Sequence, residues 1–75
     1  MDISILGVKE VLYEGQAEKV ILPAFDGEIC VLDWHESFLC RLRGGIIKTG
    51  DAFFLEIKDG VARMKDNKLV IMVTK

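Results

Sequence analysis

The sequence predicts an all-β protein, a small β-sandwich or flattened barrel of about eight to ten short strands. Short apolar segments rich in Val, Ile, Leu and Phe recur along its whole length, and several alternate in polarity as half-buried strands do. Turn residues break these segments at intervals of roughly 8 to 12 residues. No segment carries an apolar stripe of helical period. Residues 33–39 (DWHESFL) are expected to form a loop, although Asp33 could cap a single helical turn there.

The expected strands follow one another with little sequence between them. In the third, Glu18, Val20 and Leu22 share one face of the strand, and the residues between them share the other. Pro23 suits a strand end or an edge strand, because it has no N–H to donate to a neighbour. The nine expected strand segments are 3–6, 10–15, 17–23, 28–32, 38–42, 45–48, 53–57, 61–64 and 68–73.

The turn signals differ in strength. Asp59-Gly60 lies between two apolar segments and predicts a hairpin, because glycine tolerates a positive φ. Asp66-Asn67 predicts a second hairpin for the same kind of reason. Further turns are expected at 25–28 (FDGE), 43–45 (RGG) and 48–52 (KTGDA).

Size and charge limit the classes of protein that the chain can belong to. Its 75 residues suit one domain, 1–75, with a thin core. The net charge of −2 argues against nucleic acid and gives no polybasic signal for anionic lipid. No apolar run approaches the roughly 20 residues needed to span a membrane, and the N-terminus does not read as a signal peptide. The chain is therefore expected in the cytosol, with Cys30 and Cys40 free and buried.

Candidate catalytic and metal-binding residues are few. Cys30, His35 and Cys40 are spaced five residues apart and include no close pair, whereas a structural zinc site takes four ligands. A Cys-His nucleophile lacks a glycine elbow and a third orienting group, and His35 and Glu36 would point to opposite sides of an extended chain. No phosphate-binding glycine motif is present. We therefore expect no catalytic residue, no metal and no cofactor.

Two aromatic residues of the 33–39 loop carry more information than the histidine. Trp34 and Phe38 either plug the end of the core or anchor a partner protein, since tryptophan is enriched among interface hot spots. The residues alone favour neither reading.

An ordered series of residues then becomes recognisable: an aromatic-x-Gly segment, a strand ending in Leu-Pro, a Gly-Glu turn, a histidine loop and a Leu-x-x-Gly. This series resembles the N-terminal sandwich of the epsilon subunit of rotary, proton-translocating ATP synthases, which is called delta in mitochondria. Segment 53–73 resembles the family's phenylalanine strand, its glycine hairpin and its final strand, so that the likeness runs from about Ile3 to Val73. The matching residues are Tyr13, Gly15, Val20, Leu22, Pro23, Gly27, Glu28, Val31, Leu32, His35, Leu39, Leu42, Gly45 and Gly60.

The departures from the family pattern cluster around the histidine loop. The family's Pro-Gly before the histidine is Asp33-Trp34 here, and its Ala-Pro after the histidine is Glu36-Ser37. Cys30 replaces a glycine, and Asp59 replaces one of the hairpin glycines. These changes bear on the shape of the histidine loop and leave the strand pattern intact.

The resemblance implies a mechanical function. In the family this domain is a non-catalytic part of the rotor, between the gamma subunit and the ring of c subunits. The turn Asp26-Gly27-Glu28 is expected to contact the c-ring. Trp34, His35, Glu36 and Phe38 are expected to contact gamma, with Trp34 and Phe38 as anchors in place of the lost loop residues.

The same resemblance implies where the protein is located and what the family adds after the sandwich. The expected location is the cytoplasmic face of a bacterial plasma membrane, held there peripherally through the complex. The family commonly adds a C-terminal helical hairpin that in some members binds ATP or inhibits hydrolysis. The sequence stops at Lys75, so both activities are expected to be absent if it is complete. The alternatives are a free-standing β-sandwich module with another protein partner and, third, a small thiol or metal enzyme.

Overall fold

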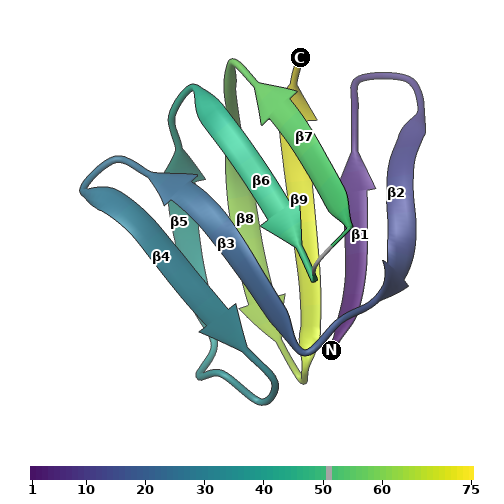
Figure 1. The fold of residues 1–75 in the computed structure, drawn as a ribbon, viewed down its shortest axis with the longest axis vertical. Coiled ribbons are helices and arrows are strands. Elements are labelled where there is room, and N and C mark those ends of the chain that lie inside the picture. The colour runs from purple at the N-terminus through teal and green to yellow at the C-terminus, as the bar shows by residue number, and fades with distance from the viewer. Residues whose placement is uncertain (51) are drawn as a thin grey trace.

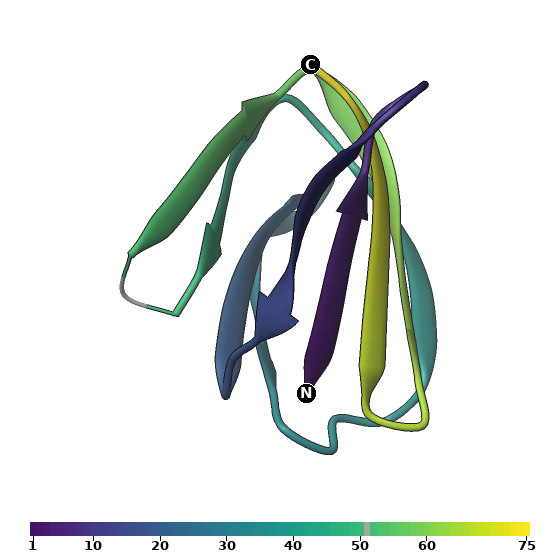
Figure 2. The same ribbon diagram turned by 90° about the vertical axis from the view of Figure 1, so that its right-hand side faces the viewer.

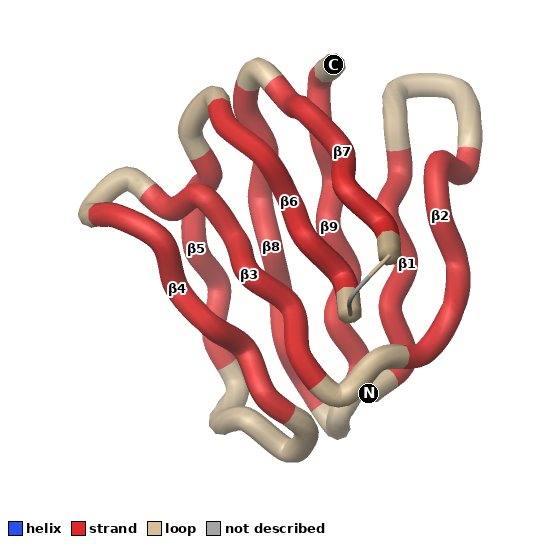
Figure 3. Tube along the Cα trace, in the orientation of Figure 1, coloured by secondary structure: helices blue, strands red, loops and turns tan. Residues whose placement is uncertain are grey.

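The computed structural model describes residues 1–50 and 52–75, which form strands joined by short loops (Figures 1 and 3). Every expected strand segment is present, so the all-β prediction is confirmed. No helix among these residues is long and apolar enough to cross a membrane. The strands are β1 (Asp2–Leu6), β2 (Val11–Gln16), β3 (Lys19–Ala24), β4 (Gly27–Leu32), β5 (Phe38–Leu42), β6 (Gly45–Thr49), β7 (Phe53–Ile57), β8 (Asp59–Lys65) and β9 (Lys68–Thr74).

The strands make one sheet that curls over itself into two layers (Figure 2). The strand order is β2-β1-β9-β8-β5-β3-β6-β7, and β4 pairs with β3. All neighbours are antiparallel except β1 and β9, which run parallel. The two layers meet where β5 and β3 share only the pair Ala24 and Leu42, so the sheet folds over at that point.

The core lies between the layers. Alternate residues of each strand point inward, and the largest that are fully buried are branched aliphatic residues and one methionine. Burying a side chain of this size stabilises the fold by about 1.5–3 kcal/mol relative to leaving it in water. These residues are Ile3, Ile5, Val20, Leu22, Val31, Leu42, Ile47, Met64, Leu69 and Ile71.

Most of the turn predictions are confirmed. Asp66 and Asn67 close the β8–β9 hairpin with φ angles of 52° and 58°, the pair of positive values that a two-residue hairpin turn of type I′ requires. A turn also follows β3 at Phe25-Asp26, and the chain bends at Gly44 between β5 and β6. Gly50 follows β6 in a turn with a φ of 58°, and the expected 48–52 turn also includes Asp51, which lies outside the described residues.

The hairpin prediction at Asp59-Gly60 is wrong. Both residues lie inside β8, and β7 pairs with β6 rather than with β8. The chain passes from one layer to the other at Lys58, whose N–H donates to the Thr74 carbonyl at 2.7 Å. A Cβ on Gly60 would lie 2.6 Å from the Met72 carbonyl oxygen, so glycine is needed there for close packing of strands and not for a turn.

Candidate docking surfaces

Strand β4 carries the two predicted contact groups at its opposite ends (Figure 1). The β3–β4 turn lies at one end and the β4–β5 loop at the other. Six strand residues span roughly 17 Å at about 3.4 Å per step. The structure therefore does not bring the two groups together, and each has to be considered as a separate site.

The β3–β4 turn presents two carboxylates to solvent. Ala24 pairs with Gly27, which leaves Phe25 and Asp26 as a two-residue loop. Gly27 has a φ of 122°, a conformation that L side chains rarely adopt. The Glu28 side chain is 61% exposed and lies 4.0 Å from the Lys48 ammonium, a contact too long and too wet to hold it firmly. Asp26 and Glu28 are therefore available to a basic partner.

Phe25 is an additional feature of this turn that the sequence patterns did not single out. Its ring is exposed, and the Arg41 guanidinium lies over it at 5.1 Å from the ring centroid. Such a stack is an attraction between the cation and the ring face. An aromatic residue inside a two-residue turn could have drawn attention to Phe25 in the sequence. Its contact with Arg41 of β5 depends on the fold and could not be predicted.

The first half of the β4–β5 loop, directly after β4, is held by backbone hydrogen bonds. The Asp33 N–H donates to the Glu18 carbonyl at 3.0 Å, and the His35 N–H donates to the Leu32 carbonyl at 3.1 Å. The Asp33 carboxylate also accepts a hydrogen bond from the Met1 amine. The segment from Asp33 to His35 is therefore held in place.

Trp34 is the most prominent side chain of this loop. It is 77% exposed, and its backbone N–H donates to the Asn67 side-chain oxygen at 2.7 Å. Its φ of 61° lies in the left-handed region that costs an L residue about 1–2 kcal/mol. Trp34 stands where the family pattern has glycine, so the backbone takes a glycine-type conformation while carrying a large aromatic side chain.

His35, Glu36 and Phe38 differ in exposure. His35 and Glu36 are exposed, and the His35 Nδ1 lies 2.9 Å from the Glu36 carbonyl oxygen. The His35 ring meets the half-buried Phe38 ring edge-on at 5.2 Å. Phe38 packs against the core, so it closes the end of the sandwich and supports the histidine from below.

The two cysteines face opposite ways. Cys30 lies on the outer side of β4 and is exposed, so the expectation that it is buried is wrong. Both faces of β4 carry apolar residues, and the pattern did not distinguish the inner face from the outer one. Cys40 is half-buried against the core, where burial raises the pKa of its thiol.

Metal-ligating groups do not converge in the part of the chain that the structure describes. No three His, Cys, Asp or Glu side chains there are grouped to hold an ion. Cys30 lies on the outer side of β4, whereas Cys40 faces inward from β5. The arrangement offers exposed carboxylates at one end and an exposed tryptophan at the other, which suits contact with other proteins.

A family model matches the whole chain. It is the model for the β-sandwich domain of the ATP synthase delta/epsilon chain, and it covers residues 1–75. The chain belongs to this family. The nine-stranded curled sheet agrees with the sandwich in the family's description.

Relatives with curated names support the family assignment. The chain is 32% identical over 77 residues to the ATP synthase epsilon chain of Halorhodospira halophila, covering 96% of this chain and 55% of the relative. It is 28% identical over 76 residues to ATP synthase epsilon chain 2 of Ralstonia nicotianae, with the same coverage of each chain. The chain thus spans about half the length of the curated relatives it matches.

Solved structures share the fold at low sequence identity. One is a chain of the central stalk and c-ring structure of the Tetrahymena thermophila mitochondrial ATP synthase, with a TM-score of 0.82 at 12% identity, covering 99% of this chain and 63% of that one. Another is a chain of the Euglena gracilis mitochondrial ATP synthase structure, with a TM-score of 0.85 at 19% identity, covering 97% and 49%. These similarities show that this chain has the same fold as the matched chains.

Proposed function

We propose that residues 1–75 form a non-catalytic rotor domain of a proton-translocating ATP synthase, binding the gamma subunit and the c-ring at opposite ends of β4. The observation that carries the proposal is the separation of two exposed contact groups by one rigid strand, in a chain that matches the delta/epsilon sandwich over its full length. The similarity to the ATP synthase epsilon chains of Halorhodospira halophila and Ralstonia nicotianae supports this proposal.

The β3–β4 turn is the proposed contact with the c-ring. In the family, the polar loops of the ring commonly carry basic groups. Glu28 and Asp26 offer exposed carboxylates that such groups can bind. Gly27 keeps the backbone of the turn accessible, because no atom lies within 4 Å of the position a Cβ would take.

The β4–β5 loop is the proposed contact with gamma. Trp34 is the anchor, and its fixed backbone reduces the entropy lost when the partner orders the loop. His35 and Glu36 form the polar rim around it, and Phe38 supports them from the core.

Torque transfer requires a stiff element between the two contacts. Strand β4 pairs with β3 along its full length, from Lys19 with Leu32 to Ala24 with Gly27. Fixed pairing of this kind resists bending between the ends. Binding of a partner to the folded domain would also stabilise its thin core by linkage.

The proposal places the domain peripherally at the cytoplasmic face of a bacterial plasma membrane, through the complex. It involves no cofactor and no catalytic residue. It includes no ATP-binding or inhibitory hairpin within residues 1–75, since the residues that the structure describes form no helix.

The test is quantitative binding of the chain to recombinant gamma from the same genome and to purified c-ring. We expect saturable binding to both, with the Trp34→Ala variant losing gamma and the Glu28→Lys variant losing the c-ring. Absence of binding to either partner at micromolar concentration, with a folded chain by circular dichroism, would contradict the proposal. A free-standing sandwich module would then be the better reading.

A further inference from the structure

Strand β4 is the outermost strand of its layer. Within the part of the chain that the structure describes, β4 pairs with β3 and has no neighbour on its other side, and Figure 1 shows this free edge at the left of the view. The other two edge strands, β2 and β7, shield one another, because the Tyr13 and Phe53 rings lie with their centroids 4.4 Å apart. Of the three described edges, the β4 edge is therefore the most open to another chain.

The sequence of β4 does little to protect this edge. Natural edge strands are commonly protected by charged residues, by proline or by a β-bulge. Strands β2 and β7 carry Glu14 and Glu56 within them, and the β1–β2 pairing contains a shift of register. After Glu28, by contrast, β4 continues with four apolar residues, and its register with β3 is continuous along the whole strand. A further strand can therefore join the sheet at β4.

The alternation of hydrogen bonds in the β3–β4 pair shows which backbone groups of β4 face solvent. In an antiparallel pair, successive residues direct their N–H and C=O groups alternately toward the neighbouring strand and away from it. The Asp33 N–H donates to the Glu18 carbonyl at 3.0 Å, so the odd-numbered residues of β4 face β3. Pro23, opposite Glu28, has no N–H, and its carbonyl accepts from the Arg43 N–H at 2.9 Å instead. The residues whose backbone groups face the free edge are therefore Glu28, Cys30 and Leu32.

These three residues make β4 self-complementary about Cys30. When two copies pair antiparallel with Cys30 opposite Cys30, each Glu28 lies opposite Leu32 of the second copy, and all three outward-facing residues of each strand take part. Pairing centred on Glu28 would instead bring two carboxylates face to face, which is destabilising. A two-fold pairing of this kind makes each contact twice. The charges of β4 therefore favour the register through Cys30.

Exposed aromatic residues at the two ends of β4 match in the same arrangement. Trp34 follows β4 and is 77% exposed, and Phe25 precedes β4 and is 56% exposed. Antiparallel pairing brings the β4–β5 loop of one copy beside the β3–β4 turn of the other. Contacts with Asn67 and Arg41 place Trp34 and Phe25 on the same side of β4, toward the layer that contains β5 and β8. Each ring can therefore meet the other across the pair.

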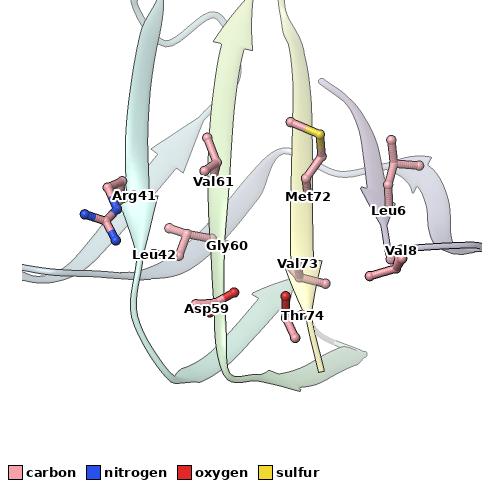
Figure 4. A pocket seen from close by; sticks show the side chains of 11 residues that line it. Leu6, Val8, Arg41, Leu42, Asp59, Gly60, Val61, Met72, Val73 and Thr74 are labelled. Atoms are coloured by element: carbon pink, nitrogen blue, oxygen red, sulfur yellow. The ribbon is translucent and has the colours of Figure 1, made fainter.

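Arg41 adds a favourable charge to this meeting point. Its guanidinium lies 5.1 Å from the Phe25 ring centroid, and Figure 4 shows it pointing away from β8 and from the pocket residues on that strand. Among the described residues, no carboxylate lies within ion-pair distance of Arg41. A tryptophan ring attracts a cation more strongly than other aromatic rings do, so Trp34 of a second copy suits this site.

We propose that β4 is a dimerisation edge, at which two copies of the chain pair antiparallel with Cys30 opposite Cys30. The pairing joins the outer layers of the two copies into one sheet and places Trp34 of each copy against Phe25 and Arg41 of the other. It also covers the Asp26-Gly27-Glu28 turn, so a paired chain cannot contact gamma or the c-ring. This last consequence rests on the proposed function, whereas the pairing itself does not.

The first test is sedimentation velocity of the chain in reducing buffer, from about 1 µM to about 1 mM, a range that suits a small interface. We expect the wild-type chain to form a dimer as its concentration rises. Cys30→Pro should abolish the dimer, because proline removes a donor from the free edge and leaves the bonds to β3 in place. Cys30→Ser keeps that donor, so this matched control should dimerise as the wild-type chain does.

A charge exchange tests the register. Leu32→Glu places a carboxylate opposite Glu28 of the second copy and should weaken dimerisation about tenfold at low salt, because the repulsion occurs twice. Its own fold should keep its stability, because position 32 lies opposite Lys19 of β3. Leu32→Glu combined with Glu28→Lys should restore the dimer. The matched control is Phe54→Glu, which also replaces an exposed apolar residue opposite a lysine, but on β7, and it should dimerise normally.

Cross-linking by diamide locates the contact. Diamide accepts the two electrons and two protons that a pair of thiols loses when a disulfide forms. Cα atoms of opposed, hydrogen-bonded residues lie about 5.5 Å apart, within the range that a disulfide spans. Peptide mass analysis of the wild-type dimer should find Cys30 joined to Cys30. Leu32→Glu should lower the yield of this cross-link, and Phe54→Glu should not.

Each outcome decides the proposal. Loss of the dimer in Cys30→Pro and Leu32→Glu, with its return in the charge exchange and unchanged circular dichroism, supports it. If Cys30→Pro fails to fold, the Leu32→Glu series still decides. A wild-type chain that stays monomeric up to about 1 mM overturns the proposal, and so does a dimer that Leu32→Glu leaves unchanged. Binding to gamma is measured separately, so a failure of the proposed function leaves the dimer result standing.

Discussion

The two ends of β4 are built on different principles. The β3–β4 turn is short, is made by Gly27 and offers carboxylates that no close contact holds. The β4–β5 loop is tied by hydrogen bonds to the β2–β3 connection, to the end of β4 and to the β8–β9 turn, and it presents Trp34 in a conformation that costs free energy. The β3–β4 turn therefore suits an electrostatic contact that does not require exact geometry. The β4–β5 loop suits a contact whose geometry is fixed before the partner binds.

The largest effect is expected from a core substitution that destabilises the fold beneath both ends of β4. Leu22 lies fully buried in β3, the strand that pairs with β4. Leu22→Ala should lower the free energy of unfolding by about 2–5 kcal/mol, because it deletes buried methyl groups and leaves a cavity. Urea denaturation measures this, and binding to both partners should fall together. Leu32→Ala, on the exposed side of β4, is the control and should change stability little.

Trp34→Ala should separate the two ends. We expect gamma binding to weaken by about 2 kcal/mol, as for an interface hot spot, while c-ring binding stays at the wild-type value. Calorimetric titration with each partner measures both affinities. An equal loss for gamma and the c-ring would show that the ends are not independent.

Glu28→Lys should act on the other end. The change reverses an exposed charge near Lys48, so c-ring affinity should fall by about tenfold at low salt and by less at high salt. Glu56→Lys, an exposed acid on β7, is the matched control. Gamma binding should be the same for both variants, and a selective loss of gamma binding in Glu28→Lys would reverse the assignment of the two ends.

The smallest expected effect comes from the backbone strain at Trp34 in the β4–β5 loop. Trp34→Gly and Trp34→Ala both remove the indole, but only glycine accepts a φ of 61° without strain. The free energy of unfolding of the glycine variant should therefore be about 1 kcal/mol higher than that of the alanine variant. Thermal or urea unfolding of the pair measures the difference, and equal stabilities would argue that the loop relaxes when the tryptophan is removed.

Local patterns in the sequence were sufficient for the strands and for some of the turns. Alternating polarity depends on neighbouring residues, and the positive φ angles at Asp66 and Asn67 depend on those residues alone. Asp59-Gly60 carries an equally good local signal, yet β7 and β8 take other partners because the layers pack that way. The choice of partner strand is a property of the whole core.

The candidate surfaces were predictable in position but not in detail. The histidine loop and the acidic turn lie between strands, as their sequences indicate. Which aromatic side chain packs inward depends on the three-dimensional arrangement: Phe38 lies against the core and Trp34 does not. The stack of Arg41 on Phe25 joins segments that are distant in the sequence, so no local pattern could reveal it.

The most direct test of the account is sequential binding on one surface. Purified c-ring is immobilised, the chain is added, and recombinant gamma is added last. The account predicts that gamma binds the chain already held on the c-ring, that Glu28→Lys prevents the first step, and that Trp34→Ala prevents only the second. Displacement of the chain from the c-ring by gamma would mean that the partners compete for one site, and it would contradict the assignment of separate contacts to the two ends of β4.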